Sequence, residues 1–170
     1  MKPADEIHVE TFEFEDDGSI PNSRLPVVLY RQVTPGDGAE TAFRTALKKH
    51  GWGGNWVNGV YDYHHYHSTA HEFLGVLSGT VHLQRGGEQG ARLSLHAGDA
   101  VVLPAGTGHK CEGNSDNFKI LGAYPDGQDW DLGTGKKSER PKVLENIGAL
   151  PRPKQDPLYG TSGPLKELWS

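Results

Sequence analysis

Between residues 73 and 123, glycine interrupts short apolar runs at intervals of about 8–12 residues, and this spacing strongly constrains the fold. Seven runs in the chain are expected to be strands: 11–15, 25–32, 73–77, 80–84, 91–95, 100–103 and 118–123. Glycine and proline also supply 23 and 11 of the 170 residues, which leaves little room for long helices. The pattern predicts an all-β fold, either a sandwich or a small barrel.

One helix is expected, between residues 39 and 50. Asp37 and Glu40 have the spacing of a capping box, apolar residues recur at helical period, and Gly51 can end the helix. The stretch 52–56 that follows, Trp-Gly-Gly-Asn-Trp, matches neither phosphate-binding pattern and is expected to be a glycine-rich loop.

The two ends of the chain have opposite charge. The first twenty residues carry seven acids and one base, whereas six basic residues lie between 136 and 154. Beyond residue 124 the strand pattern gives way to proline, glycine and charge, which predicts an extended strap over the barrel, with the acidic head as one candidate neighbour. We therefore expect a single domain, 1–170, with a barrel core at about 57–124 and a wrapping tail at 125–170.

Composition argues against nucleic-acid binding, a membrane span, secretion and an intramolecular disulfide. A net charge of −5 disfavours nucleic acid, because neutralising phosphates requires a basic face. No run approaches the roughly 18 apolar residues of a membrane helix, and no apolar stretch follows Lys2 as in a signal peptide. A single cysteine, Cys111, excludes an intramolecular disulfide. A cytoplasmic protein is expected.

Histidine is unusually concentrated, since six of the nine histidines lie between His50 and His82. If residues 59–67 form a strand, His65 and His67 share one face and lie about 7 Å apart, which suits a metal between them. The short turn at 68–70 can fold Glu72 back beside them. Imidazoles with a carboxylate form a ligand set for a divalent transition metal.

A second segment offers a third imidazole. Gly98-Asp99 is typical of a turn, 100–103 of a buried strand, and the stretch 104–106 of a rigid second turn that starts a new strand at His109. In a barrel, His109 could face the first two histidines across the interior.

These two segments resemble the paired motifs of the cupin superfamily. The first motif, G-x5-H-x-H-x4-E-x6-G, fits at Gly59, His65, His67, Glu72 and Gly79. The second fits at Gly98, Pro104, Gly106 and His109, but Gly113 replaces its final asparagine and Asn114 comes one residue late. The motifs span about a third of the chain. The stretch 122–125, Gly-Ala-Tyr-Pro, is further similar to small YjlB-like bacterial cupins, a likeness that covers most of the chain.

The resemblance implies a double-stranded β-helix barrel that holds one divalent metal: iron, manganese, nickel or zinc. By resemblance His65, His67, Glu72 and His109 would be its ligands, with at least one position left for water, substrate or dioxygen. Analogy of fold also suggests a homodimer, in which the acidic N-terminal strands could extend a partner's sheet.

Four more residues are candidates near the metal. His71 should point away from Glu72 by strand alternation, which favours a place outside the ligand set over a fifth ligand. Tyr61 and Tyr63 share the parity of His65, so their hydroxyls could hold substrate or their rings could pack in the core. Cys111 shares the parity of His109, so it could line the cavity or pack as a small apolar residue.

Two classes of function remain open. The first is a metal-dependent enzyme, an oxygenase or an isomerase, acting on a small polar molecule. The second is a module that binds or senses a small molecule through the metal without turnover. A pocket beside the metal with groups able to move protons would distinguish them.

Overall fold

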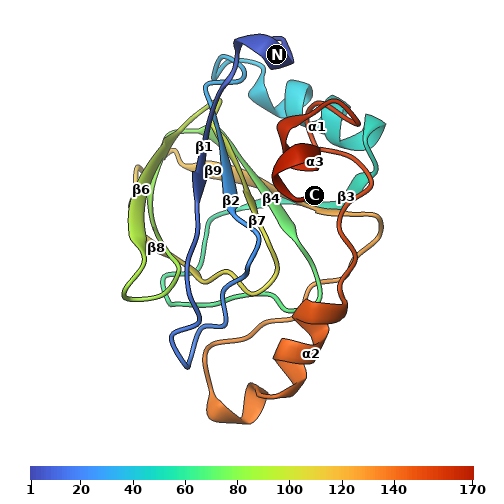
Figure 1. The fold of residues 1–170 in the computed structure, drawn as a ribbon. Coiled ribbons are helices and arrows are strands. Elements are labelled where there is room, and N and C mark those ends of the chain that lie inside the picture. Colours follow the sequence, from blue (N-terminus) through green and yellow to red (C-terminus); the bar gives the residue numbers. More distant parts are fainter.

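Two antiparallel sheets form most of the computed structural model, which describes residues 1–170 (Figure 1). A six-stranded sheet has the order β1-β2-β7-β4-β9-β3 and a three-stranded sheet has the order β6-β5-β8. The strands are β1 His8–Phe12, β2 Val27–Arg31, β3 Trp52–Asn58, β4 Glu72–Ser78, β5 Thr80–Arg85, β6 Ala91–His96, β7 Ala100–Leu103, β8 His109–Asn114 and β9 Lys119–Pro125. The predicted all-β cupin barrel is confirmed.

Both faces of the larger sheet are buried in its central strands β2, β7, β4 and β9. One face meets the smaller sheet, where residues such as Leu83, Val101 and Ile120 fill the barrel interior. The other face is covered by helices, and there Phe43 packs edge-on against Phe73, 5.6 Å between ring centroids. This is why β7 reads as a continuous apolar run, whereas β5 alternates between buried and half-buried residues.

The strands predicted between 73 and 123 are confirmed to within about two residues at each end. The loop predicted at 52–56 is wrong, because these residues belong to β3, which pairs with β9. Trp52 is buried in the core, and the register shifts between Gly53 and Trp56, where Gly54 has a φ of +67°. The glycines thus form an irregularity within a strand instead of ending it.

The predicted helix is present as α1, Ala39–Lys49, but its predicted capping box is wrong. Gly38 occupies the N-cap position with a φ of +80°, and no side chain caps the first turn. The predicted end is right, since Gly51 follows the C-cap residue His50 with a φ of +79°.

The tail is less extended than predicted. It contains the helices α2, Lys142–Ala149, and α3, Pro164–Leu168, and the short 3-10 helix η2, Lys137–Glu139; a second 3-10 helix, η1, spans Ala4–Glu6. Helix α3 lies beside α1 against the larger sheet, and α2 lies at the opposite end of the barrel (Figure 1). None of the helices is long and apolar enough to cross a membrane.

The acidic head and the basic tail do meet at one point. Arg140 donates two hydrogen bonds to the carboxylate of Asp16, at 2.7 and 2.6 Å. The contact between head and tail that charge suggested is therefore present at this pair.

Candidate metal centre

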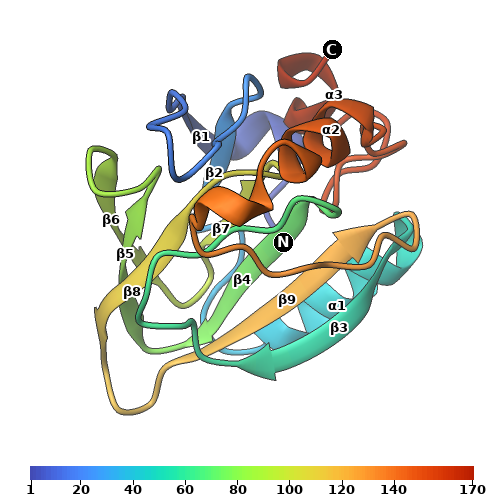
Figure 2. The same cartoon turned by 90° about the horizontal axis from the view of Figure 1, so that it is seen from below.

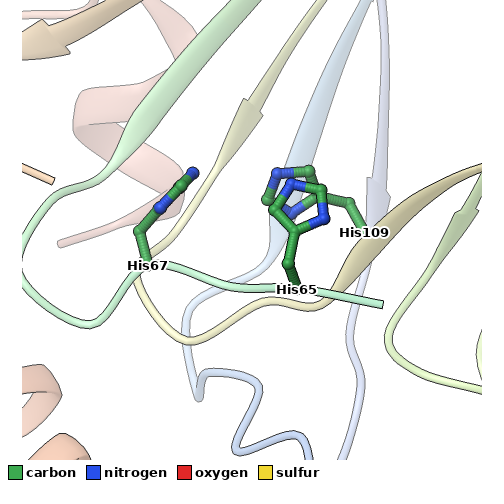
Figure 3. A group of neighbouring side chains, drawn as sticks. All are labelled: His65, His67 and His109. Carbon is green, nitrogen blue, oxygen red and sulfur yellow. The ribbon is translucent and has the colours of Figure 1, made fainter. Parts of the chain in front are cut away.

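Three buried histidines converge at one end of the barrel (Figure 3). His65 and His67 lie on the segment before β4, and His109 is the first residue of β8. One ring nitrogen from each lies within 4.8 Å of the others.

The segment that carries His65 and His67 does not form the continuous strand that was expected at 59–67. Between β3 and β4 only isolated bridges occur, and His65 exchanges two backbone hydrogen bonds with His109, at 3.2 and 2.9 Å. The carbonyl of His67 accepts from the N–H of Gly106 at 2.7 Å. Gly106 has a φ of +96°, and a Cβ there would lie 2.4 Å from the Asn22 carbonyl oxygen, so this turn requires glycine.

Each histidine is oriented by a hydrogen bond from its Nδ1 to a backbone carbonyl. The accepting oxygens belong to Tyr63, Asp131 and Thr107, at 2.9 Å from His65, 2.5 Å from His67 and 3.1 Å from His109, respectively. Because a carbonyl only accepts, each Nδ1 carries a proton, and in the neutral ring the Nε2 lone pair is free to bind a metal.

Glu72, the first residue of β4, completes the group and is only 3% exposed. Its Oε1 lies 3.2 Å from His109 Nε2 and its Oε2 lies 3.5 Å from His67 Nε2. Glu72 Oε1 has no hydrogen-bond donor, although it is buried. Lone pairs that face each other in a buried site require a cation between them, either a proton or a metal, so the donor set fits a divalent metal.

The ionisation of these groups agrees with this requirement. Burial acts to raise the pKa of Glu72, but His67 and His109 hold it well below its usual range. Burial acts to lower the pKa of His67, but Glu72 outweighs it and raises that pKa. Burial, with the neighbouring His109, lowers the pKa of His65 to about 3. Glu72 is therefore an anion, His65 is neutral, and His67 binds a proton more readily than a free histidine does.

Sequence reasoning missed two residues behind the carboxylate. The Tyr124 hydroxyl donates to Glu72 Oε2 at 3.0 Å and accepts from the Trp56 indole N–H at 2.7 Å. Burial and the Glu72 charge raise the pKa of Tyr124, so its hydroxyl stays protonated. The Trp56 ring lies over Gly122, where a Cβ would approach it to 2.2 Å. Gly122 and Tyr124 are two residues apart, so they lie on the same face of a strand. This alternation was the one signal in the sequence that could have indicated the arrangement.

The tail also contributes to the site. Besides the carbonyl that orients His67, the carboxylate of Asp131 accepts from the backbone N–H of Ser68 at 2.5 Å and from its hydroxyl. Seen from below, this part of the tail runs beside the segment before β4 (Figure 2), and Tyr66 pairs with Gly133. Nothing in the local sequence pointed to this contact.

A cavity of about 210 Å³ opens from the histidines to the surface. Its lining comprises Trp56, Val57, Asn58, Gly59, Val60, Tyr61, His65, His67, Glu72, Leu74, His109, Tyr124 and Trp130. All four predicted ligands therefore border a space that a small molecule can enter.

The four further candidate residues near the metal differ in where their side chains lie. Tyr61 lines the cavity, one of the two positions left open for it. Tyr63 does not line the cavity and is exposed; its ring stacks on Tyr61 with 5.1 Å between centroids and lies 5.6 Å from the His65 ring. The cavity position considered for Cys111 is wrong, because it packs in the barrel interior opposite Leu83. His71 points away from the site as expected and accepts a hydrogen bond from the N–H of Ala105.

Comparison with known proteins shows the family of this chain. A family model described as a cupin domain matches residues 56–121. An uncharacterized protein named YjlB from Bacillus subtilis (strain 168) is 42% identical over 165 residues, which cover 96% of this chain and 98% of that one. The chain is a YjlB-like cupin. In this YjlB-like cupin the register of β8 against β5 shifts by one residue between Cys111 and Gly113, directly before Asn114, the displaced asparagine of the second motif.

Solved structures similar to this YjlB-like cupin are more distant. A DUF861-family protein from Thermotoga maritima shares 18% identity at a TM-score of 0.35, covering 69% of this chain and 97% of that one. A single-substitution variant of oxalate decarboxylase from B. subtilis shares 17% identity at a TM-score of 0.40, covering 68% and 29%. The family assignment rests on the sequence matches.

Proposed function

We propose that this chain is a metal-dependent enzyme that acts on a small polar molecule, with one divalent transition metal held by His65, His67, Glu72 and His109. The observation that carries the proposal is the set of Nε2 lone pairs and carboxylate oxygens that face one another at the inner end of the cavity. A metal bound there would supply Lewis acidity or, for iron and manganese, oxygen chemistry.

The chain's own residues prepare the site. Backbone carbonyls hold the three imidazoles in one tautomer, which leaves only small rearrangements for metal binding. Tyr124 holds one oxygen of Glu72 and leaves the other free. The buried surroundings exclude bulk water and strengthen every electrostatic interaction at the bottom of the cavity.

An oxygenase fits the lining better than an isomerase. An isomerase that moves protons requires a base beside the substrate, and outside the proposed ligands the cavity offers only the hydroxyls of Tyr61 and Tyr124 as titratable groups. Tyr124 is committed to Glu72 as a donor. The same scarcity of bases favours, as a second candidate, a module that binds a small molecule through the metal without converting it.

Elemental analysis of protein purified without a metal-affinity tag tests the metal centre. We expect about one transition-metal ion per chain, and markedly less in a His65→Ala/His109→Ala variant that keeps the wild-type circular dichroism spectrum. A screen of small polar molecules under air and under nitrogen then separates the functions. Oxygen-dependent turnover supports the oxygenase, oxygen-independent turnover the isomerase, and binding without turnover the second candidate.

The homodimer and the cytoplasmic location expected above remain predictions. Light scattering during size-exclusion chromatography tests the first, and cell fractionation tests the second.

A further inference from the structure

We infer that the substrate enters this cavity as a planar ring that presents oxygen donors to the metal and carries at most one negative charge. The inference rests on the metal centre proposed above and specifies the class of small polar molecule, with catechol as its simplest representative. It follows from the walls, the charge and the size of the cavity.

Aromatic side chains stand beside the histidines at the mouth. The Tyr61 ring packs edge-on against His65 at 5.1 Å, and the Trp130 ring packs edge-on against His67 at 5.4 Å between centroids. Both are well exposed, Tyr61 by 48% and Trp130 by 46%. A molecule that reaches the Nε2 atoms therefore passes exposed aromatic faces, and flat rings stack favourably on such faces.

The cavity has no cationic side chain. Among its thirteen lining residues there is no lysine and no arginine, and Glu72 is the only acid. A divalent metal together with the Glu72 carboxylate has a net charge of +1, which one anionic oxygen donor neutralises. A dianion such as oxalate would leave a buried negative charge without a partner, which is costly in a low-dielectric site.

The volume admits one ring. An apolar cavity of roughly 150 Å³ is enough to bind benzene, so about 210 Å³ holds one ring with a few substituents. Val57, Val60 and Leu74 make much of the remaining lining apolar, and Asn58 is the only amide side chain that lines the cavity and could hydrogen-bond a sugar.

Calorimetric titration of zinc-loaded protein tests this inference, because zinc binds catechol without redox chemistry. The probes are catechol, oxalate and inorganic phosphate, and zinc content is measured on every sample. We expect catechol to bind at least about tenfold more tightly than the two other probes. Trp130→Ala and Tyr61→Ala should each weaken catechol binding by about five- to tenfold, the size of an aromatic contact, while zinc content stays unchanged.

Leu132→Ala is the matched control, because Leu132 is exposed on the same loop as Trp130 but does not line the cavity. It should bind catechol like the wild type. If zinc is bound but oxalate or phosphate matches catechol, or neither aromatic variant weakens catechol, the substrate class is wrong and the metal centre stands. If wild-type protein binds no zinc, the metal centre itself is wrong and this inference fails with it.

Discussion

Tyr124 donates its hydroxyl hydrogen to Oε2 of Glu72, and both side chains are buried although 52 residues separate them in the chain. The other oxygen of Glu72 lacks a donor. One hydrogen bond thus determines which carboxylate oxygen is available to the proposed metal.

Removing that hydroxyl should weaken the metal site without abolishing it. We expect Tyr124→Phe to lower zinc affinity about tenfold, the usual cost of losing a partner that orients a ligand. Competition with a chromogenic chelator measures the change. Tyr159→Phe is the control, because its hydroxyl donates to the exposed Lys2 carbonyl, remote from the site. Equal affinities in the two variants would contradict the orienting role.

The ligand assignment predicts a graded loss of metal. His65→Ala, His67→Ala and His109→Ala each remove a donor, and Glu72→Gln replaces a charged donor with a neutral one, so each should retain less metal after dialysis. His82→Ala should retain as much as the wild type, since His82 lies on the smaller sheet, where its Nδ1 forms a hydrogen bond with the Ser94 hydroxyl. Wild-type metal content in two or more of the four ligand variants would refute the assignment.

Metal removal should lower the melting temperature but leave the barrel folded. A metal that binds only the native state stabilises it by about 4 kcal/mol at a thousandfold excess over its dissociation constant, which corresponds to roughly 10 °C for a chain of this size. The apolar core between the sheets does not involve the metal. Circular dichroism with and without chelator measures both quantities. A chain fully unfolded in chelator at room temperature would show that the metal is structural.

Acid should destabilise the metal-free protein through buried neutral histidines. Burial lowers the pKa of His71 to about 4, so between that value and about 6.5 the unfolded chain binds more protons than the native one. Stability from this group is therefore complete above about pH 6.5 and lost as the pH falls, by about 2 kcal/mol at pH 5. His65 acts in the same direction.

Urea denaturation in chelator at pH 7 and pH 5 checks this effect. In His71→Gln the new side chain does not titrate, but its carbonyl can still accept from the Ala105 N–H. The loss between the two pH values should shrink by about 2 kcal/mol. Identical losses in wild type and variant would exclude His71 as a source of the acid sensitivity.

Much of the proposed ligand set could be found from the sequence, because metal motifs place histidines and acids at short, fixed separations. The partners that orient the ligands could not, because they come from distant segments: Asp131 is 64 residues from His67, and Trp56 is 68 residues from Tyr124. Strand parity placed Cys111 on the interior face correctly, but it could not decide between the cavity and the core, because parity does not give the depth along the barrel. The Cys111 side chain lies beyond the cavity, among core residues.

The glycines of the larger sheet provide a test of packing. Gly122→Ala would place a Cβ 2.2 Å from the Trp56 ring, so the indole must move and its hydrogen bond to Tyr124 must break. We expect a loss of about 1–3 kcal/mol in unfolding free energy and weaker metal binding. Gly53→Ala is the control on the neighbouring strand, where a Cβ meets nothing within 4 Å. Similar stability of both variants would contradict this packing.

The carbonyl of Asp131 that orients His67 belongs to neither the barrel segment at 57–124 nor the matched stretch 56–121. A barrel cut at residue 124 would keep every proposed ligand but lose one of the three hydrogen bonds that fix their rings. The part of the chain needed to build the complete site is therefore larger than the segment that carries the motifs. Chimeras that exchange barrels between relatives should bind metal more tightly when the first ten residues of the tail are exchanged together with the barrel.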